Sequence, residues 1–159
     1  MQLKDKVVVV TGSTRGIGRA IAEACAREGA SVVVCSRKAE AVDAAVNEMQ
    51  KAGHRVSGIF CDVSSQADLE RLLAHATTTW GRVHVWINNA GLSGGLRFLE
   101  EMGPEEIAEI VRVNVTGTML ACRLAIPYLL GQGGGVLINM SGKGWRGEAS
   151  PHTAVYAAT

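Results

Sequence analysis

A glycine-rich segment near the N-terminus has the residue types and spacing of a phosphate-binding turn. Gly12, Gly16 and Gly18 stand between an apolar β-branched run at residues 7–10 and an apolar helical rhythm. Glycines in such a strand-to-helix turn allow close backbone approach, and free N–H groups at the helix start attract a phosphate. A turn without a ligand is the alternative, because the spacing is not that of the G-x-G-x-x-G fingerprint. The segment predicts a dinucleotide pyrophosphate site at Gly12, Ser13, Thr14, Arg15, Gly16, Ile17 and Gly18.

The residues after the second expected strand bear on which dinucleotide is bound. A carboxylate at this place would accept hydrogen bonds from both ribose hydroxyls and favour NAD. This chain has Ser36, Arg37 and Lys38 instead. Arg37 can form a fork with a ribose 2′-phosphate, and Arg15 can reach the same region. We therefore predict NADP(H) as the cofactor and NAD(H) as the less favoured one, with solvated cations at a helix start as the alternative.

Strand and helix signals alternate along the chain and place these residues at the carboxyl ends of strands. Apolar runs predict strands at residues 7–10, 31–35, 55–61, 82–87 and 136–139. Amphipathic segments predict helices at residues 16–28, 39–51, 64–79 and 104–130. This alternation predicts an α/β fold, a Rossmann-like doubly wound parallel sheet with strand order 3-2-1-4-5, as a single nucleotide-binding domain over residues 1–159.

Polar residues also follow the later expected strands. Asp62 and Val63 follow the third, where Asp62 either accepts a hydrogen bond from an adenine amino group or serves as a loop or cap residue. Residues 88–91, Asn-Asn-Ala-Gly, follow the fourth strand, and Ser141 follows the fifth. In doubly wound sheets, ligands bind at these strand ends, near the point where the strand order reverses.

Composition and charge narrow the classes of partner. The chain has 159 residues, 19% of them charged, and a net charge of +1 without a basic run, which argues against nucleic acid. The four cysteines form no C-x-x-C pair and are expected to be buried free thiols, and the four histidines are scattered, so we expect no metal site. No signal peptide or apolar run of about 18 residues is recognisable. We therefore expect a cytoplasmic protein that does not bind membranes.

Several segments together resemble the short-chain dehydrogenase/reductase family: the glycine turn, residues 88–91, Asn114, Ser141 and Tyr156. The resemblance implies hydride transfer between a nicotinamide and a carbonyl or secondary alcohol of a small molecule. It implies that Tyr156 is the general acid/base, that Ser141 orients the carbonyl oxygen, and that Asn114 holds a helix distortion and a proton-relay water. It also implies that Asn89, Ala90 and Gly91 line the cofactor cleft and that the full-length protein is a homo-oligomer.

The chain departs from the family pattern in three places. The family's activating lysine would fall directly after Thr159, the last residue, so we expect an N-terminal part of a longer enzyme, inactive alone and without the C-terminal strands and helices. The segment 142–152 is longer than usual between Ser141 and Tyr156, is similar to the chlorophyll b reductase-like branch, and suggests bulky substrates. His84 replaces a frequent aspartate, which weakens a contact behind the cleft. A non-catalytic nucleotide-binding protein or an interaction fragment remains the alternative.

Overall fold

Five parallel strands form the sheet that carries the site. The computed structural model describes residues 1–142 and 151–159. The strands are β1 (Val7–Val10), β2 (Ser31–Ser36), β3 (Val56–Phe60), β4 (Val85–Asn88) and β5 (Val136–Asn139), in the order β3-β2-β1-β4-β5. Every pairing is parallel, with Val9 of β1 opposite both Val33 of β2 and Trp86 of β4. The predicted Rossmann-like topology is confirmed.

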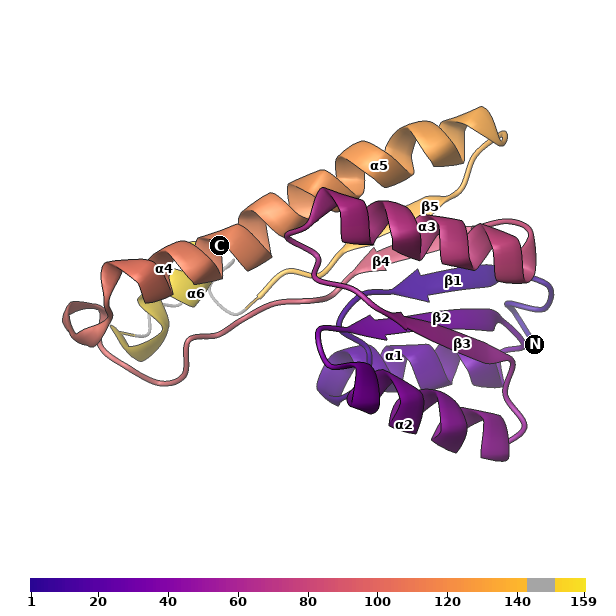
Figure 1. The fold of residues 1–159 in the computed structure, drawn as a ribbon, viewed down its shortest axis with the longest axis horizontal. Coiled ribbons are helices and arrows are strands. Elements are labelled where there is room, and N and C mark those ends of the chain that lie inside the picture. The colour runs from indigo at the N-terminus through magenta and orange to yellow at the C-terminus, as the bar shows by residue number, and fades with distance from the viewer. Residues whose placement is uncertain (143–150) are drawn as a thin grey trace.

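Helices cover both faces of this sheet (Figure 1). α1 (Gly16–Arg27) and α2 (Ala39–Lys51) lie on one face, and α3 (Gln66–Trp80) and α5 (Thr118–Gly131) lie on the other. Successive strand residues point to opposite faces, so Val8 and Val10 belong to the core beneath α1 and α2, and Val9 to the core beneath α3 and α5. Because both faces are covered, the strands are uninterrupted apolar runs instead of alternating ones.

The fourth strand begins later than the sequence predicts, at Val85 instead of residue 82. The preceding residues are bonded outside the regular ladder. The N–H of Val83 donates to the Tyr128 hydroxyl at 3.2 Å, and the N–H of Val7 donates to Nδ1 of His84 at 3.0 Å. At Val7, the first residue of β1, a side chain therefore takes the place of a main-chain acceptor. His84 therefore supplies a contact at the amino ends of β1 and β4, at the opposite end of these strands from the cleft.

The long predicted helix is continuous over residues 104–131 but contains a distortion. It consists of α4 (Pro104–Val111), the π-helical turn η2 (Arg112–Gly117) and α5. A Cβ at Gly117 would lie 3.0 Å from Cγ2 of Val63, so glycine lets this turn cross closely over the β3–α3 loop. The α4 end extends beyond the sheet beside α6 (Ala154–Ala157) in Figure 1. The short helices η1 (Leu99–Glu101) and η3 (Pro151–Thr153) are not among the predicted elements, and α6 carries Tyr156.

By length and composition alone, this continuous helix is long and apolar enough to cross a membrane. Its most apolar window of 18 residues has a mean hydropathy of 1.3, and 28% of that window is buried. The sequence expectation counted only unbroken apolar runs, and this helix mixes apolar residues with Thr, Asn and Gly. Ala121, Ala125 and Leu129 are buried, so one face packs as a core helix does. Helices packed on a sheet meet the same criterion, so the feature is weak support for a membrane span.

The cysteines fit the expectation in part. All four are free thiols. Cys35 and Cys61 are buried at the ends of β2 and β3, as predicted, but Cys25 and Cys122 are only half-buried. Both of these lie on helices, and the Cys122 thiol donates to Oδ1 of Asn139 at the end of β5.

The His84 contact predicts a loss of stability in mild acid. Burial, followed by the nearby Lys6 and Arg82 charges, lowers the pKa of His84 in the folded protein. The unfolded chain therefore binds more protons below about pH 6.5, and the free energy of unfolding falls as the pH drops through that value. The loss should be small, because the ring is largely screened by solvent. Urea unfolding at pH 7.5 and 5.5 measures it, and His84→Asn should flatten the pH dependence. An identical dependence in the variant would contradict this role.

Candidate functional site

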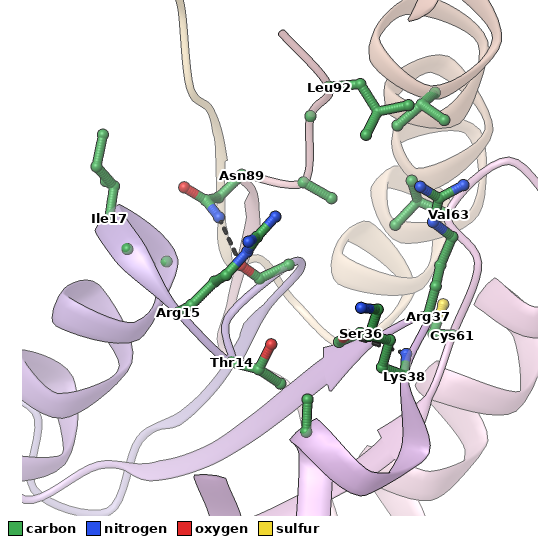
Figure 2. A pocket seen from close by; sticks show the side chains of 17 residues that line it. Thr14, Arg15, Ile17, Ser36, Arg37, Lys38, Cys61, Val63, Asn89 and Leu92 are labelled. Carbon is green, nitrogen blue, oxygen red and sulfur yellow. Dashed lines mark hydrogen bonds between the residues drawn. The ribbon is translucent and has the colours of Figure 1, made fainter. Parts of the chain in front are cut away.

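A cleft of about 560 Å³ opens at the carboxyl ends of the strands, around the glycine turn (Figure 2). All of the predicted cofactor-binding residues except Ser13 and Asp62 line it. Lining residues that the sequence analysis did not assign to the site are Lys38, Ala41, Cys61, Leu92 and Val113. Each of them lies within four residues of a predicted one, so their proximity in sequence was the available signal. Among the described residues, no group of three or more His, Cys, Asp or Glu is placed to hold a metal ion.

A side chain would be unfavourable at each glycine of the turn, but for different physical reasons. Gly12 and Gly16 have positive φ values of 62° and 58°, which side chains disfavour. A Cβ at Gly18 would overlap the side-chain amide of Asn89 and lie 2.5 Å from the carbonyl oxygen of Gly12. A Cβ at Gly16, in contrast, would have nothing within 4 Å. Gly18 is thus required for packing, whereas the space above Gly16 is open.

That open space faces the start of α1. Arg15 occupies the N-cap position without a side-chain hydrogen bond to the helix, and the first intrahelical donor is the N–H of Arg19. The N–H groups of the first turn therefore have no intrahelical acceptor and carry the positive end of the helix dipole. A dinucleotide pyrophosphate fits these donors and the space above Gly16.

Ser13 lies in the glycine turn but outside the lining of the cleft, and its contact with a cofactor stays a prediction. Its side chain is fully buried, and its hydroxyl donates to the carbonyl oxygen of Val10 at 2.6 Å and accepts from the N–H of Cys35 at 3.2 Å. Its own N–H donates to the carbonyl oxygen of Cys35. Every polar group that could face a ligand is already bonded to β1 or β2, except the carbonyl oxygen. Ser13 holds the turn in place and does not line the cleft.

Thr11 is a structural residue of the site that sequence reasoning missed. Its hydroxyl accepts hydrogen bonds from the N–H groups of Asn89 and Ala90, each at 3.0 Å. The side-chain amide of Asn89 in turn donates hydrogen bonds to the carbonyl oxygens of Thr11 and Gly12, at 2.9 and 3.1 Å. The glycine turn and the segment after β4 are therefore fixed to one another. No spacing in the sequence marks a contact between residues so far apart.

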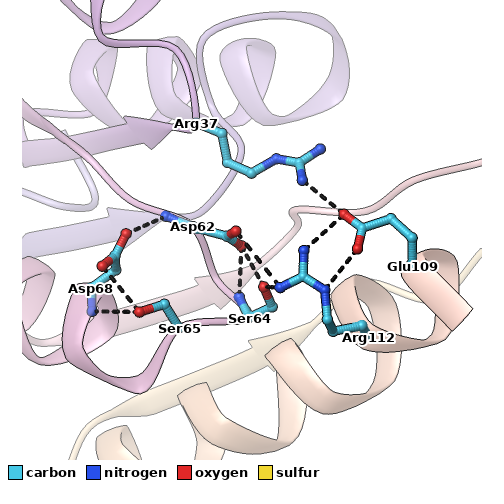
Figure 3. A network of polar contacts seen from close by, with 7 residues as sticks. All are labelled: Arg37, Asp62, Ser64, Ser65, Asp68, Glu109 and Arg112. Atoms are coloured by element: carbon cyan, nitrogen blue, oxygen red, sulfur yellow. Dashed lines mark hydrogen bonds and ion pairs between the residues drawn. The ribbon is translucent and has the colours of Figure 1, made fainter.

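Asp62 does not line the cleft and is bonded within its own loop. Its carboxylate accepts from the N–H and hydroxyl of Ser64, at 3.0 and 2.6 Å, and lies 3.7 Å from Nη1 of Arg112 (Figure 3). Burial raises the pKa of Asp62, but the Ser64 hydrogen bonds and the Arg112 charge outweigh this and hold that pKa below its usual value. These contacts fit the alternative interpretation of Asp62 as a loop residue, and the adenine contact stays a prediction.

Asn114 lies in the π-helical turn and connects three segments. Its Oδ1 accepts from the N–H of Leu92 at 2.7 Å, and its Nδ2 donates to the carbonyl oxygen of Leu92 at 2.9 Å and to the Thr159 hydroxyl at 2.8 Å. The Thr159 hydroxyl in turn donates to the carbonyl oxygen of Tyr156 at 3.0 Å. The helix distortion, the loop after β4 and the α6 helix therefore meet at Asn114.

Ser141 and Tyr156 come together at the carboxyl end of β5. Ser141 is exposed directly after the strand, and the Tyr156 ring stands against the backbone of the next residue. A Cβ built on Gly142 would lie 2.9 Å from the Tyr156 hydroxyl oxygen. The structure thus brings Asn114, Tyr156 and the Ser141 segment to one end of the sheet. Most of the longer segment 142–152 lies outside the described residues.

Comparison with known proteins identifies the family of this chain. A family model described as short chain dehydrogenase matches residues 6–159. This chain belongs to the short-chain dehydrogenase family. Chlorophyll(ide) b reductase NOL of Arabidopsis thaliana is 39% identical to this chain over 155 residues, which cover 96% of this chain and 44% of the plant protein. The probable chlorophyll(ide) b reductase NYC1 of the same plant is 38% identical over 96% of this chain and 34% of that protein.

Solved structures give the same result. A short chain dehydrogenase from Mycobacterium smegmatis is 34% identical to this chain, with a TM-score of 0.90 over 99% of this chain and 66% of that one. An actinorhodin polyketide ketoreductase with NADPH is 33% identical, with a TM-score of 0.89 over 99% of this chain and 60% of that one. The chain spans less than half the length of the two plant reductases. The family resemblance is confirmed over essentially the whole chain.

Proposed function

We propose that this protein is an NADP(H)-dependent oxidoreductase that transfers hydride between the nicotinamide and a carbonyl or secondary alcohol. The observation that carries the proposal is one continuous set of features. The open glycine turn and the Arg37 guanidinium line one cleft. Leu92, which also lines it, is bonded to Asn114, and the Tyr156 ring stands against Gly142, the residue after Ser141. Family membership supports oxidoreductase chemistry, and one structural relative is described with NADPH.

The residues of the cleft have distinct roles in this proposal. The first-turn N–H groups of α1 bind the pyrophosphate, and Arg37, with Arg15 nearby, binds the ribose 2′-phosphate. Val63 and Ala90 form apolar walls of the cleft. When bound, the nicotinamide supplies or accepts the hydride. Hydrogen bonds with Thr11 and Asn114 hold the backbone of residues 89–92 in place. These bonds fix the wall against which the cofactor lies.

The chemical step needs a proton at the carbonyl oxygen. The Tyr156 hydroxyl donates this proton during reduction and accepts it during oxidation. The Ser141 hydroxyl donates a hydrogen bond to the same oxygen and stabilises its developing charge. Asn114 keeps the α6 backbone in register through Thr159 and so positions Tyr156.

The substrate and the assembly are further parts of the proposal. The long segment between Ser141 and Tyr156 and the likeness to chlorophyll(ide) b reductases both support a bulky carbonyl substrate. The side chains of Met119, Ile126 and Leu130 on α5 are exposed by 67%, 47% and 71%. Exposed apolar surface of this kind is typical of a subunit interface, which supports a homo-oligomer.

Arg37→Ala tests the cofactor assignment. We expect the variant to lower the affinity for NADPH by about tenfold, because a charge-assisted bond to phosphate is lost, and to leave the affinity for NADH within about twofold. Fluorescence titration of the purified protein with each cofactor measures both values. Arg27→Ala, an exposed cation at the far end of α1, is the matched control. An unchanged ratio of NADPH to NADH affinity in Arg37→Ala would overturn the assignment.

A further inference from the structure

The guanidinium that is expected to meet the 2′-phosphate already has an anionic partner from the chain. Nη1 of Arg37, directly after β2, donates to Oε1 of Glu109 on α4 at 3.0 Å (Figure 3). Among residues 1–142 and 151–159, Arg37 donates no other side-chain hydrogen bond. The two side chains are 43% and 37% exposed, so an incoming ligand can reach them.

We propose that Glu109 competes with the ribose 2′-phosphate for Arg37 and thereby sets how strongly the protein prefers NADPH over NADH. In the free protein the carboxylate holds the guanidinium. Binding of a 2′-phosphate exchanges this carboxylate for the phosphate, whereas a dinucleotide without the phosphate leaves the pair intact. The inference rests on the proposed NADP(H) function and adds a residue of α4 that limits the selectivity.

The charge balance around Glu109 supports competition. Glu109 also accepts from Nε and Nη2 of Arg112, at 2.7 and 2.8 Å, and Arg112 lies 3.7 Å from Asp62. Two guanidinium groups thus alternate with two carboxylates, and the network has no net charge. The Arg112 hydrogen bonds, and then the Arg37 contact, lower the pKa of Glu109, so its carboxylate is charged near neutral pH. A phosphate approaching Arg37 therefore meets a cation whose charge is already balanced.

The geometry also indicates which hydrogen bond of Glu109 breaks when a phosphate binds. Arg112 donates two hydrogen bonds to the carboxylate, whereas Arg37 donates one. Glu109 keeps its Arg112 fork when Arg37 turns to a phosphate, so no charge is left unpaired. A phosphate offers Arg37 a bidentate contact and a larger charge than the carboxylate. Because exposed ion pairs are weak, we expect the competition to cost a factor of about three to five in NADPH affinity.

The test is Glu109→Gln, which removes the charge and keeps the shape. We expect its Kd for NADPH and for 2′,5′-ADP to fall by about three- to fivefold, and its Kd for NADH and 5′-AMP to stay within about 1.5-fold. Glu105→Gln, the same change on the first turn of α4, should alter none of them, because Glu105 forms no ion pair with residues 1–142 or 151–159. Glu109→Asp, too short to keep the contact, should resemble Glu109→Gln. In an Arg37→Ala background, Glu109→Gln should have no effect on the NADPH Kd.

The outcomes separate this inference from the proposed function. If Arg37→Ala lowers the NADPH preference but Glu109→Gln leaves it unchanged or lowers it, competition is wrong and the cofactor assignment stands. If Glu109→Gln tightens NADPH equally in the Arg37→Ala background, the effect is one of general charge and the inference also fails. If Arg37→Ala leaves the NADPH to NADH ratio unchanged, the cofactor assignment itself fails.

Discussion

In the full-length protein, replacement of Tyr156 by phenylalanine is expected to lower kcat by about a thousandfold and to leave NADPH binding unchanged. The variant keeps the ring that stands against Gly142 and removes only the proton-donating hydroxyl. General acid–base catalysis contributes about 10²- to 10⁴-fold, so the loss of one such group dominates the rate. NADPH oxidation with a panel of ketones measures kcat, and fluorescence titration measures binding.

The other tyrosine of the chain, Tyr128, provides a matched control. The Tyr128 hydroxyl accepts from the N–H of Val83, far from Ser141 and Asn114 in the fold. Tyr128→Phe should cost about 1 kcal/mol in the free energy of unfolding and change kcat by less than about twofold. Equal loss of turnover in both variants, or full turnover in Tyr156→Phe, would contradict the role of Tyr156. Ser141→Ala should give a smaller loss than Tyr156→Phe, because it removes one hydrogen bond and no proton transfer.

The paired variants Gly16→Ala and Gly18→Ala should separate binding from folding. At Gly18 the added methyl group meets the Asn89 amide and the Gly12 carbonyl oxygen, so we expect a loss of about 1–3 kcal/mol in the free energy of unfolding. At Gly16 it meets nothing within 4 Å, and only the positive φ of 58° costs stability, about 1 kcal/mol. The Gly16 methyl group would nevertheless occupy the space proposed for the phosphate.

Gly16→Ala should therefore weaken NADPH binding by at least about tenfold while the protein remains folded. Urea unfolding and fluorescence titration of the same samples give both quantities. Wild-type affinity in a folded Gly16→Ala variant would show that the pyrophosphate does not lie on this turn.

The sheet and most of the cleft were predictable because their signals are local. Each buried strand is a short apolar run that ends before a helix, and the topology of alternating strands and helices brings their carboxyl ends together. The lining residues Gly12, Gly16 and Ala90 follow from that topology. Family motifs then located Asn114, Ser141 and Tyr156, although their roles stay predictions.

The features that the sequence did not specify are hydrogen-bond partners, some of them local and some far apart in the chain. Ser13 lies in the middle of the glycine turn but points into the sheet, where it bonds to Val10 and Cys35. The Asp62 carboxylate accepts hydrogen bonds from Ser64 within its own loop. Thr11 and Glu109 act through partners more than 70 residues away, at Asn89 and Arg37. No periodicity or spacing specifies such pairs, because they depend on how the helices are placed over the strand ends.

The account is tested most directly by calorimetric titration of the purified protein with NADPH and with NADH. It predicts saturable binding of one cofactor per chain, with NADPH bound more tightly than NADH, because the phosphate gains Arg37. Binding of neither dinucleotide by a folded protein would contradict the proposed oxidoreductase and favour an interaction protein on this fold. Tighter binding of NADH would contradict the assignment of Arg37 to the 2′-phosphate.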